Sequence, residues 1–177
     1  DFVLYYTVAA DPVGVDLLTY LPPDEQTGYY LMLAAPEFAP AAGPAIPKRL
    51  IFVMDRSGSM AGEQMDQARG ALRYAINTLE PGDAVNIVDY ATAVDTYADS
   101  AVIAEAAARQ GLLAYVDAME ATGGTDIHGA LTTALDMLRG DERAEMVVFL
   151  TDGKPTVGVT DVETILADVA AANVHRA

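Results

Sequence analysis

The chain has 177 residues, and 52% of them are hydrophobic, which suits one folded domain with appended pieces and argues against disorder. It contains no cysteine, so neither a disulfide framework nor a zinc–thiolate site can form. The formal net charge of −16, from 10 basic and 26 acidic residues, disfavours nucleic-acid binding, because neutralising phosphates needs clustered Lys and Arg.

Targeting segments are not visible in the sequence. No apolar stretch reaches the length of a membrane span, and no secretory signal is present. The chain begins with Asp1 inside a strand-like run, which is consistent with a fragment whose targeting signal lies upstream. The missing cysteines leave the compartment open.

The N-terminal 35 residues predict a β-strand extension. Three β-rich runs are separated by turn residues: Phe2–Val8, Val13–Leu21 and Tyr29–Leu33. Residues 36–47 are rich in Pro and Ala, and we expect an extended linker there, because proline removes a backbone donor and restricts the residue before it.

From Lys48 onward, apolar runs alternate with segments of helical periodicity. The expected strands are Leu50–Met54, Ala84–Tyr90, Val94–Tyr97 and Met146–Leu150, and the expected helices cover about 63–79, 104–119, 127–139 and a last segment after Thr160. In that last helix we place Val162, Ile165, Leu166 and Val169 on the buried face, with Thr160 and Glu163 as a capping box. This alternation predicts an α/β fold with a mostly parallel central sheet flanked by helices.

The first of these strands ends in an abrupt polar turn. Leu50–Met54 reads as a strand buried on both faces, and Asp55, Ser57 and Ser59 follow it at alternate positions. In an open α/β sheet, ligands bind in the crevice at the carboxyl ends of the strands. One carboxylate and two hydroxyls there suit a small hard cation such as Mg²⁺, although Ser57 or Ser59 as a simple helix cap is the plainer alternative.

The pattern Asp55-x-Ser57-x-Ser59 resembles the metal-ion-dependent adhesion site of von Willebrand factor type A domains. Two later loops supply the remaining pieces, Thr125 after Gly123-Gly124 and Asp152 within Thr151-Asp152-Gly153. The resemblance implies a Rossmann-like fold over residues 48–177. It also implies a metal site for Mg²⁺, or Mn²⁺ or Ca²⁺, in which the serines ligate directly and the two aspartates act through water or by holding the serines.

A second resemblance concerns the N-terminus. The stretch Asp1–Tyr6 is similar to the end of a VIT domain, the module that precedes the type A domain in inter-alpha-trypsin inhibitor heavy chains. This similarity implies a secreted or cell-surface protein. The alternative is a β-hairpin extension packed on the main domain.

The family fold has six core strands, and we expect only four of them here. The family's last strands and last helix would lie beyond Arg176, so the strand Met146–Leu150 is expected at an open sheet edge. An exposed apolar edge invites pairing. We therefore expect dimerisation through this edge, or its coverage by the N-terminal strands.

By resemblance, the function is a metal-dependent protein-binding module that recognises an exposed Glu or Asp of a partner. It is not an enzyme, because the serines have no evident base. One alternative is a Mg²⁺-dependent phosphotransfer enzyme of haloacid-dehalogenase type, which would need an Asp where Ser57 stands. Another is a purely structural assembly domain. The Gly-rich turn of a dinucleotide site is missing between Asp55 and Gly62.

Three further residues lie near the expected site. We expect Arg56 and Met60 to project to its rim, where either side chain can meet a partner. Asp89 stands within a buried strand pattern, where it either forms a hydrogen bond near the site or starts the turn into the next strand. The second interpretation of Asp89 is the preferred one.

Overall fold

The computed structural model describes residues 13–20, 28–36 and 46–174. The chain divides into two compact units, Asp1–Pro44 and Ala45–Ala177. The expected strand at residues 2–8, the VIT-like stretch and most of the expected linker lie outside the described residues.

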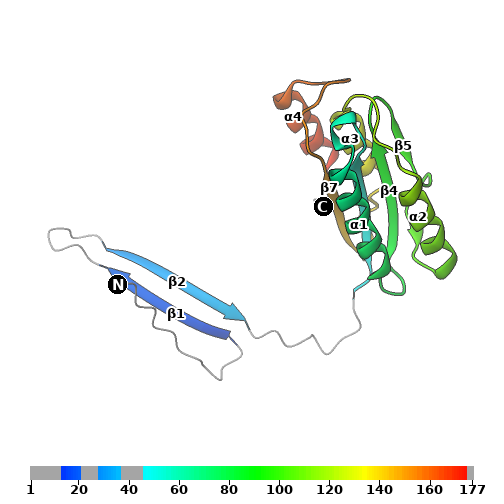
Figure 1. Cartoon of the computed structure of the whole chain (residues 1–177). Coiled ribbons are helices and arrows are strands. Elements are labelled where there is room, and N and C mark those ends of the chain that lie inside the picture. Colours follow the sequence, from blue (N-terminus) through cyan, green and yellow to red (C-terminus); the bar gives the residue numbers. More distant parts are fainter. Residues whose placement is uncertain (1–12, 21–27, 37–45, 175–177) are drawn as a thin grey trace. The chain divides into compact units, whose positions relative to one another are not determined.

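The first unit contains an antiparallel pair of strands (Figure 1). Strand β1 (Val13–Tyr20) pairs with β2 (Tyr29–Pro36) along its whole length, with Val13 opposite Pro36 and Tyr20 opposite Tyr29. Two of the three strands expected in this region are therefore confirmed.

The second unit alternates strands and helices. Its elements are β3 (Lys48–Asp55), the short 3₁₀ turn η1 (Gly58–Met60), α1 (Glu63–Asn77), β4 (Ala84–Tyr90), β5 (Val94–Thr96), β6 (Val102–Ile103), α2 (Ala106–Ala118), α3 (Ile127–Asp136), β7 (Ala144–Leu150) and α4 (Val162–Ala172). The sheet order is β5-β4-β3-β7, and β4 and β7 both run parallel to β3. The short strands β5 and β6 pair antiparallel with β4. The mostly parallel α/β fold is confirmed, and β6 is an element that the sequence patterns did not predict.

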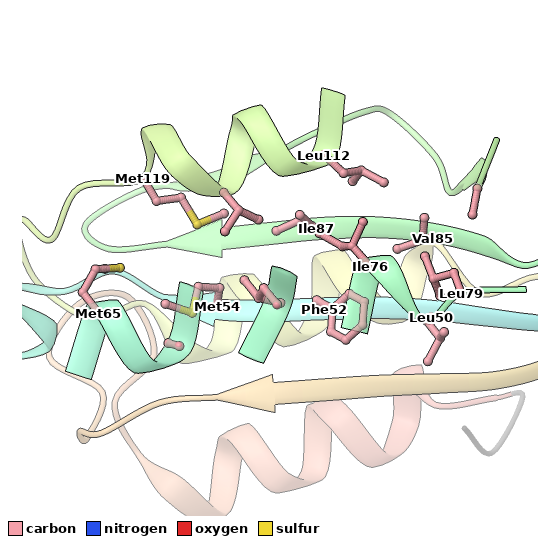
Figure 2. Packing of buried hydrophobic residues seen from close by; sticks show 14 of the residues in the cluster. Leu50, Phe52, Met54, Met65, Ile76, Leu79, Val85, Ile87, Leu112 and Met119 are labelled. Atoms are coloured by element: carbon pink, nitrogen blue, oxygen red, sulfur yellow. The ribbon is translucent and has the colours of Figure 1, made fainter. Parts of the chain in front are cut away.

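Helices cover both faces of this sheet. The side chains of β3 point alternately to the two faces and join a separate hydrophobic cluster on each. Phe52 and Met54 belong to the cluster formed with α1 and α2, where Ile76 and Leu112 are also buried (Figure 2). Ile51 and Val53 belong to the opposite cluster, which is formed with α3 and includes Tyr90 of β4 and Val169 of α4. The strand is buried on both faces, as its continuous apolar sequence predicts.

The last helix departs from the expected pattern in two ways. Ile165 is buried, but Val162 and Leu166 are 58% and 63% exposed, so the placement of these two residues on the buried face was wrong. The cap is also different, because the side chain of Asp161, not Thr160, accepts the hydrogen bond from Thr164 N at 2.9 Å. The buried stripe of α4 is narrow, since one face of a single helix meets the α3 side of the sheet.

Strand β7 is the last strand of the sheet path within the described residues. Met146 and Phe149 on this strand are 42% and 36% exposed, which agrees with the expected open edge. What covers this edge, whether a second copy or another segment, stays a prediction.

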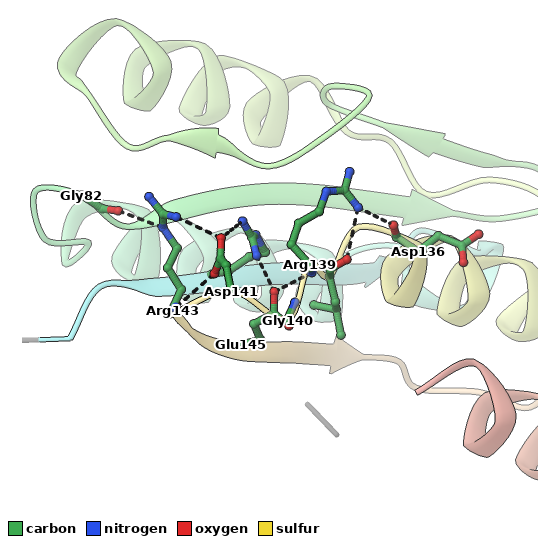
Figure 3. A network of polar contacts seen from close by, with 9 residues as sticks. Gly82, Asp136, Arg139, Gly140, Asp141, Arg143 and Glu145 are labelled. Atoms are coloured by element: carbon green, nitrogen blue, oxygen red, sulfur yellow. Dashed lines mark hydrogen bonds and ion pairs between the residues drawn. The ribbon is translucent and has the colours of Figure 1, made fainter. Parts of the chain in front are cut away.

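A network of charged groups ties the amino ends of β3 and β7 together. Arg49 pairs with Glu145 and, at 2.8 Å, with Asp141. Glu145 also accepts hydrogen bonds from the backbone amides of Arg139 and Gly140, at 2.7 and 3.0 Å (Figure 3). This network lies at the end of the sheet opposite to the polar turn at Asp55.

Candidate metal centre

The candidate site lies where β3 and β7 end. Both strands are parallel, so Asp55, the last residue of β3, and the segment after Leu150 meet at the same edge of the sheet. The turn η1 follows Asp55 and carries Ser59. The first α-helix begins only at Glu63, so the serines do not cap it, and its first-turn amides belong to Gly62 and later residues.

Asp55 is fully buried, and both of its carboxylate oxygens accept hydrogen bonds from the protein. Oδ1 accepts from the backbone amide of Ser57 at 2.7 Å, and Oδ2 accepts from the Thr151 hydroxyl at 2.6 Å. A carboxylate with both oxygens engaged in this way shapes the turn and holds its neighbours.

The two serines and Asp152 form the exposed part of the site. The hydroxyls of Ser57 and Ser59 lie 3.1 Å apart, and Ser59 donates to Asp152 Oδ1 at 2.8 Å. Since the Ser59 proton goes to Asp152, the Ser57 hydroxyl is the donor to Ser59. Four of the five predicted residues therefore belong to one hydrogen-bonded cluster, although their loops are 93 residues apart in the sequence.

The loop before Thr125 is joined to the turn that carries the serines. Gly58 donates from its backbone amide to the carbonyl of Gly123 at 3.1 Å, which joins the two loops. Thr125 itself is buried, and its amide donates to the Thr156 hydroxyl at 2.9 Å. The neighbouring Asp126 caps α3 by accepting from Gly129 N at 3.0 Å.

Thr151 is a site residue that sequence reasoning missed. It appears in the motif Thr151-Asp152-Gly153 as an ordinary turn residue, and nothing local points to its partner. Its hydroxyl bonds to Asp55, which is 96 residues away, so only the pairing of β7 with β3 reveals the contact.

The donor chemistry fits a hard divalent cation. Three hydroxyls and two carboxylates offer only oxygen, the ligand that Mg²⁺, Mn²⁺ and Ca²⁺ prefer. Among the residues that the structure describes, no group of three or more His, Asp or Glu side chains is placed to hold a metal. A cation at this turn would therefore depend on Ser57, Ser59 and Thr125 as much as on the aspartates.

Arg56 and Met60 do not project to the rim as expected. Met60 is 4% exposed and packs in the α1 and α2 core. Arg56 turns away from the serines and pairs with Asp89 and, at 2.6 Å, with Asp95. Each was misplaced because the alternation of a strand does not continue through the 3₁₀ turn.

Asp89 lies inside β4, opposite Asp95 of β5, so the preferred interpretation that it starts the turn into the next strand was wrong. It is 3% exposed and accepts hydrogen bonds from Arg56 Nε and from the Tyr115 hydroxyl. These three residues line a cavity of about 530 Å³, and the exposed residues Asp95 and Glu120 line it as well.

The family of this chain follows from a comparison with known domains. Residues 50–154 match the model of the von Willebrand factor type A domain, and the matched region holds Asp55, both serines, Thr125 and Asp152. The chain belongs to the von Willebrand factor type A family. Within the described residues, no helix of this family member is long and apolar enough to span a membrane.

Curated relatives are similar over most of the chain. The chain is 32% identical to human inter-alpha-trypsin inhibitor heavy chain H6 over 187 aligned residues, which cover 99% of this chain and 14% of that protein. It is 31% identical to the mouse inter alpha-trypsin inhibitor, heavy chain 4, over 91% of this chain and 17% of the relative. The chain thus spans about one sixth of the length of these relatives.

Solved structures share the fold. The von Willebrand factor type A protein from Catenulispora acidiphila has a TM-score of 0.63 and 17% identity, over 92% of this chain and 38% of that one. The pilus adhesin SpaC from Lactobacillus rhamnosus GG has a TM-score of 0.56 and 20% identity, over 64% and 16% of the two chains.

Proposed function

We propose that this domain is a divalent-cation-dependent protein-binding module that recognises an acidic residue of a partner. The observation that carries this proposal is the hydrogen-bonded cluster of Ser57, Ser59 and Asp152 at the carboxyl end of the sheet. Ser57, Ser59 and Thr125 would hold the ion, with Asp152 and Asp55 holding the serines. When bound, the cation supplies a Lewis-acidic position that accepts one more oxygen ligand.

The charge balance of the turn supports an acidic ligand. The Asp55 carboxylate already accepts hydrogen bonds from Ser57 N and from the Thr151 hydroxyl, so protein groups partly offset its negative charge. The neutral hydroxyls of the serines add no negative charge to the ion's shell. A divalent ion held this way keeps net positive charge, which favours a carboxylate from Glu or Asp of the partner. The opposing field of a −16 chain is screened over roughly 8 Å at physiological salt.

The same geometry disfavours the phosphotransfer alternative. A nucleophilic aspartate must present a free oxygen to the substrate, but Asp55 is fully buried and both oxygens accept hydrogen bonds. The acid/base aspartate of that chemistry is replaced by Ser57. We therefore infer a non-enzymatic interaction module, and the similarity to heavy chains of the inter-alpha-trypsin inhibitor supports a secreted or cell-surface location.

A titration tests the cation site first. We expect calorimetry to show about one Mg²⁺ or Mn²⁺ bound per chain, with binding lost or weakened at least tenfold in Ser59→Ala. The matched control is Ser100→Ala, which removes an exposed hydroxyl from the loop before β6, near the opposite end of the sheet. Equal binding by the wild type and both variants would contradict the assigned ligands.

A second measurement tests the partner chemistry. Peptides of one scaffold that carry Glu, Asp or Gln at a central position are titrated into the loaded domain, with and without a chelator. Binding of the Glu or Asp peptide alone, abolished by the chelator, is expected. Cation binding with no preference for acidic peptides would favour the structural assembly role instead.

A further inference from the structure

Arg56 is the central residue of the turn that carries the candidate metal centre. It lies between Asp55 and Ser57, and Asp55 Oδ1 accepts a hydrogen bond from the Ser57 amide at 2.7 Å. These three residues therefore form a turn that is closed by an aspartate side chain. The conformation of Arg56 sets how the Asp55 carboxylate and the Ser57 hydroxyl are placed relative to each other.

The backbone of Arg56 joins this turn to two other segments. Its amide donates to the carbonyl of Tyr90 at 2.8 Å, and its carbonyl accepts from the amide of Thr122 at 2.7 Å. Tyr90 ends β4, and Thr122 precedes the glycines that lead to Thr125. Arg56 thus connects the serine turn with the neighbouring strand and with the loop of Thr125.

The side chain of Arg56 holds the residue in this position. Its Nε donates to Asp89, and its Nη2 donates to Asp95 at 2.6 Å. The Arg56 side chain is 19% exposed and that of Asp89 is 5% exposed, so water competes little for the bond between them. Asp89 and Asp95 lie opposite each other in the pairing of β4 and β5, so the guanidinium bridges two strands.

Asp89 is itself held from two sides. Val85 and Ile87 precede it at alternate positions of β4 and pack in the cluster formed with α1 and α2, so the alternation of the strand directs Asp89 to the same face. On this face its second oxygen accepts a hydrogen bond from the Tyr115 hydroxyl of α2. A chain of contacts therefore runs from α2 through Tyr115 and Asp89 to the turn at Arg56.

We propose that Arg56 is a positioning residue of the metal centre, whose bonds to Asp89 and Asp95 keep the Asp55–Ser57 turn and the Thr125 loop at the spacing that a divalent cation needs. This inference rests on the proposed cation site. A guanidinium suits the task because its planar fork reaches two carboxylates at once and fixes an orientation, which the point charge of a lysine does not.

The charge of Arg56 gives the test a distinctive sign. Arg56→Met removes a positive charge beside the site and leaves two carboxylates without their cation, so Coulomb attraction alone would tighten Mg²⁺ binding. Loss of positioning has the opposite effect. We expect the Mg²⁺ dissociation constant to increase about tenfold, as when a residue that orients metal ligands is lost. Calorimetry on the whole chain measures this constant, and far-UV circular dichroism checks that the variant is folded.

Arg49→Met is the matched control. Arg49 lies on β3, its side chain is 9% exposed, and it pairs with the nearly buried Glu145 and the more exposed Asp141 at the opposite end of the sheet. Its loss should lower the thermal unfolding midpoint and leave the Mg²⁺ affinity unchanged. Arg56→Lys keeps the charge without the fork, and its dissociation constant should lie between those of the wild type and Arg56→Met.

Each outcome decides the matter. Equal or tighter Mg²⁺ binding by Arg56→Met, with binding by the wild type, would overturn this role of Arg56 and leave the proposed cation site intact. Equal weakening in Arg49→Met would also overturn it, because the effect would then be a general loosening of the fold. If Arg56→Met does not fold, weaker binding by Arg56→Lys supports the inference and unchanged binding overturns it. A wild type that binds no divalent cation would overturn both proposals.

Discussion

The Thr151 hydroxyl donates a hydrogen bond of 2.6 Å to Oδ2 of the fully buried Asp55, across the junction of β3 and β7. This contact anchors the carboxylate that in turn holds the Ser57 amide, so a residue outside the predicted ligand set fixes the geometry of the turn. The site is therefore a product of two strand ends and not of the Asp55–Ser59 segment alone.

Replacing Thr151 should loosen this turn. Thr151→Val removes the donor to a buried carboxylate, and we expect the free energy of unfolding to fall by about 1.5 kcal/mol, with weaker Mg²⁺ binding. Urea unfolding followed by circular dichroism and calorimetric titration measure the two effects. Thr151→Ser keeps the hydroxyl and should retain both properties. Equal behaviour of the Val and Ser variants would show that the contact with Asp55 is unimportant.

Asp89 should matter more for stability than Asp95, although both pair with Arg56. Asp89→Ala leaves Arg56 Nε and the Tyr115 hydroxyl without their partner in a nearly buried position, and we expect a loss of about 3 kcal/mol. The Asp95 side chain is 59% exposed, so Asp95→Ala is expected to cost less than about 1 kcal/mol. Chemical denaturation of both variants compares them directly, and a larger loss in Asp95→Ala would refute this ranking.

Because of Glu145, we expect the free energy of unfolding to depend on pH in the acid range. Burial by itself raises the pKa of Glu145, but hydrogen bonds from the Arg139 and Gly140 amides and from Arg49 outweigh it and hold the pKa below 4.5. A lowered pKa in the folded state means that the ionised form stabilises the fold. This contribution is complete above pH 4.5 and is lost as the pH falls through the folded-state pKa.

The measurement for Glu145 is urea unfolding at neutral pH and at about pH 3.5. The wild type should lose about 1 kcal/mol more over this range than Glu145→Gln, which cannot titrate at that position. Glu142→Gln, at an exposed neighbour of the network, is the matched control and should follow the wild type. The idea fails if Glu145→Gln retains the full acid sensitivity of the wild type.

The cap of α4 gives a local prediction. Asp161 accepts hydrogen bonds from Thr164 N and, at 2.6 Å, from the Thr164 hydroxyl, and these bonds lower its pKa. Asp161→Ala should therefore increase amide hydrogen exchange in the first turn of α4, whereas Thr160→Ala should not. Faster exchange in Thr160→Ala alone would restore the capping box that the sequence suggested.

Local patterns were sufficient for most of the fold. The continuous apolar runs of β3 and β4 and the helical spacing of Met65, Leu72 and Ile76 placed their elements correctly, because burial imposes a period on the sequence that can be read without knowing the partner. The short strand β6 has only two residues, too few to show any period. In α4 the period was visible, but the width of the buried face depends on which elements pack against it, so Val162 and Leu166 were misplaced.

The sequence by itself determined the order of strands and helices, since this order depends on local spacing. It also determined the residues of the candidate centre, since these follow from a recognisable motif: Asp55, Ser57, Ser59, Thr125 and Asp152. Only the tertiary structure decided what holds them. The sheet order β4-β3-β7 brings Tyr90 and Thr151 to opposite sides of Asp55, and the path of η1 sends Arg56 to Asp89 and Met60 into the core. These contacts join segments about 30 to 100 residues apart, and their partners follow from strand pairing in space, which periodicity along one segment does not encode.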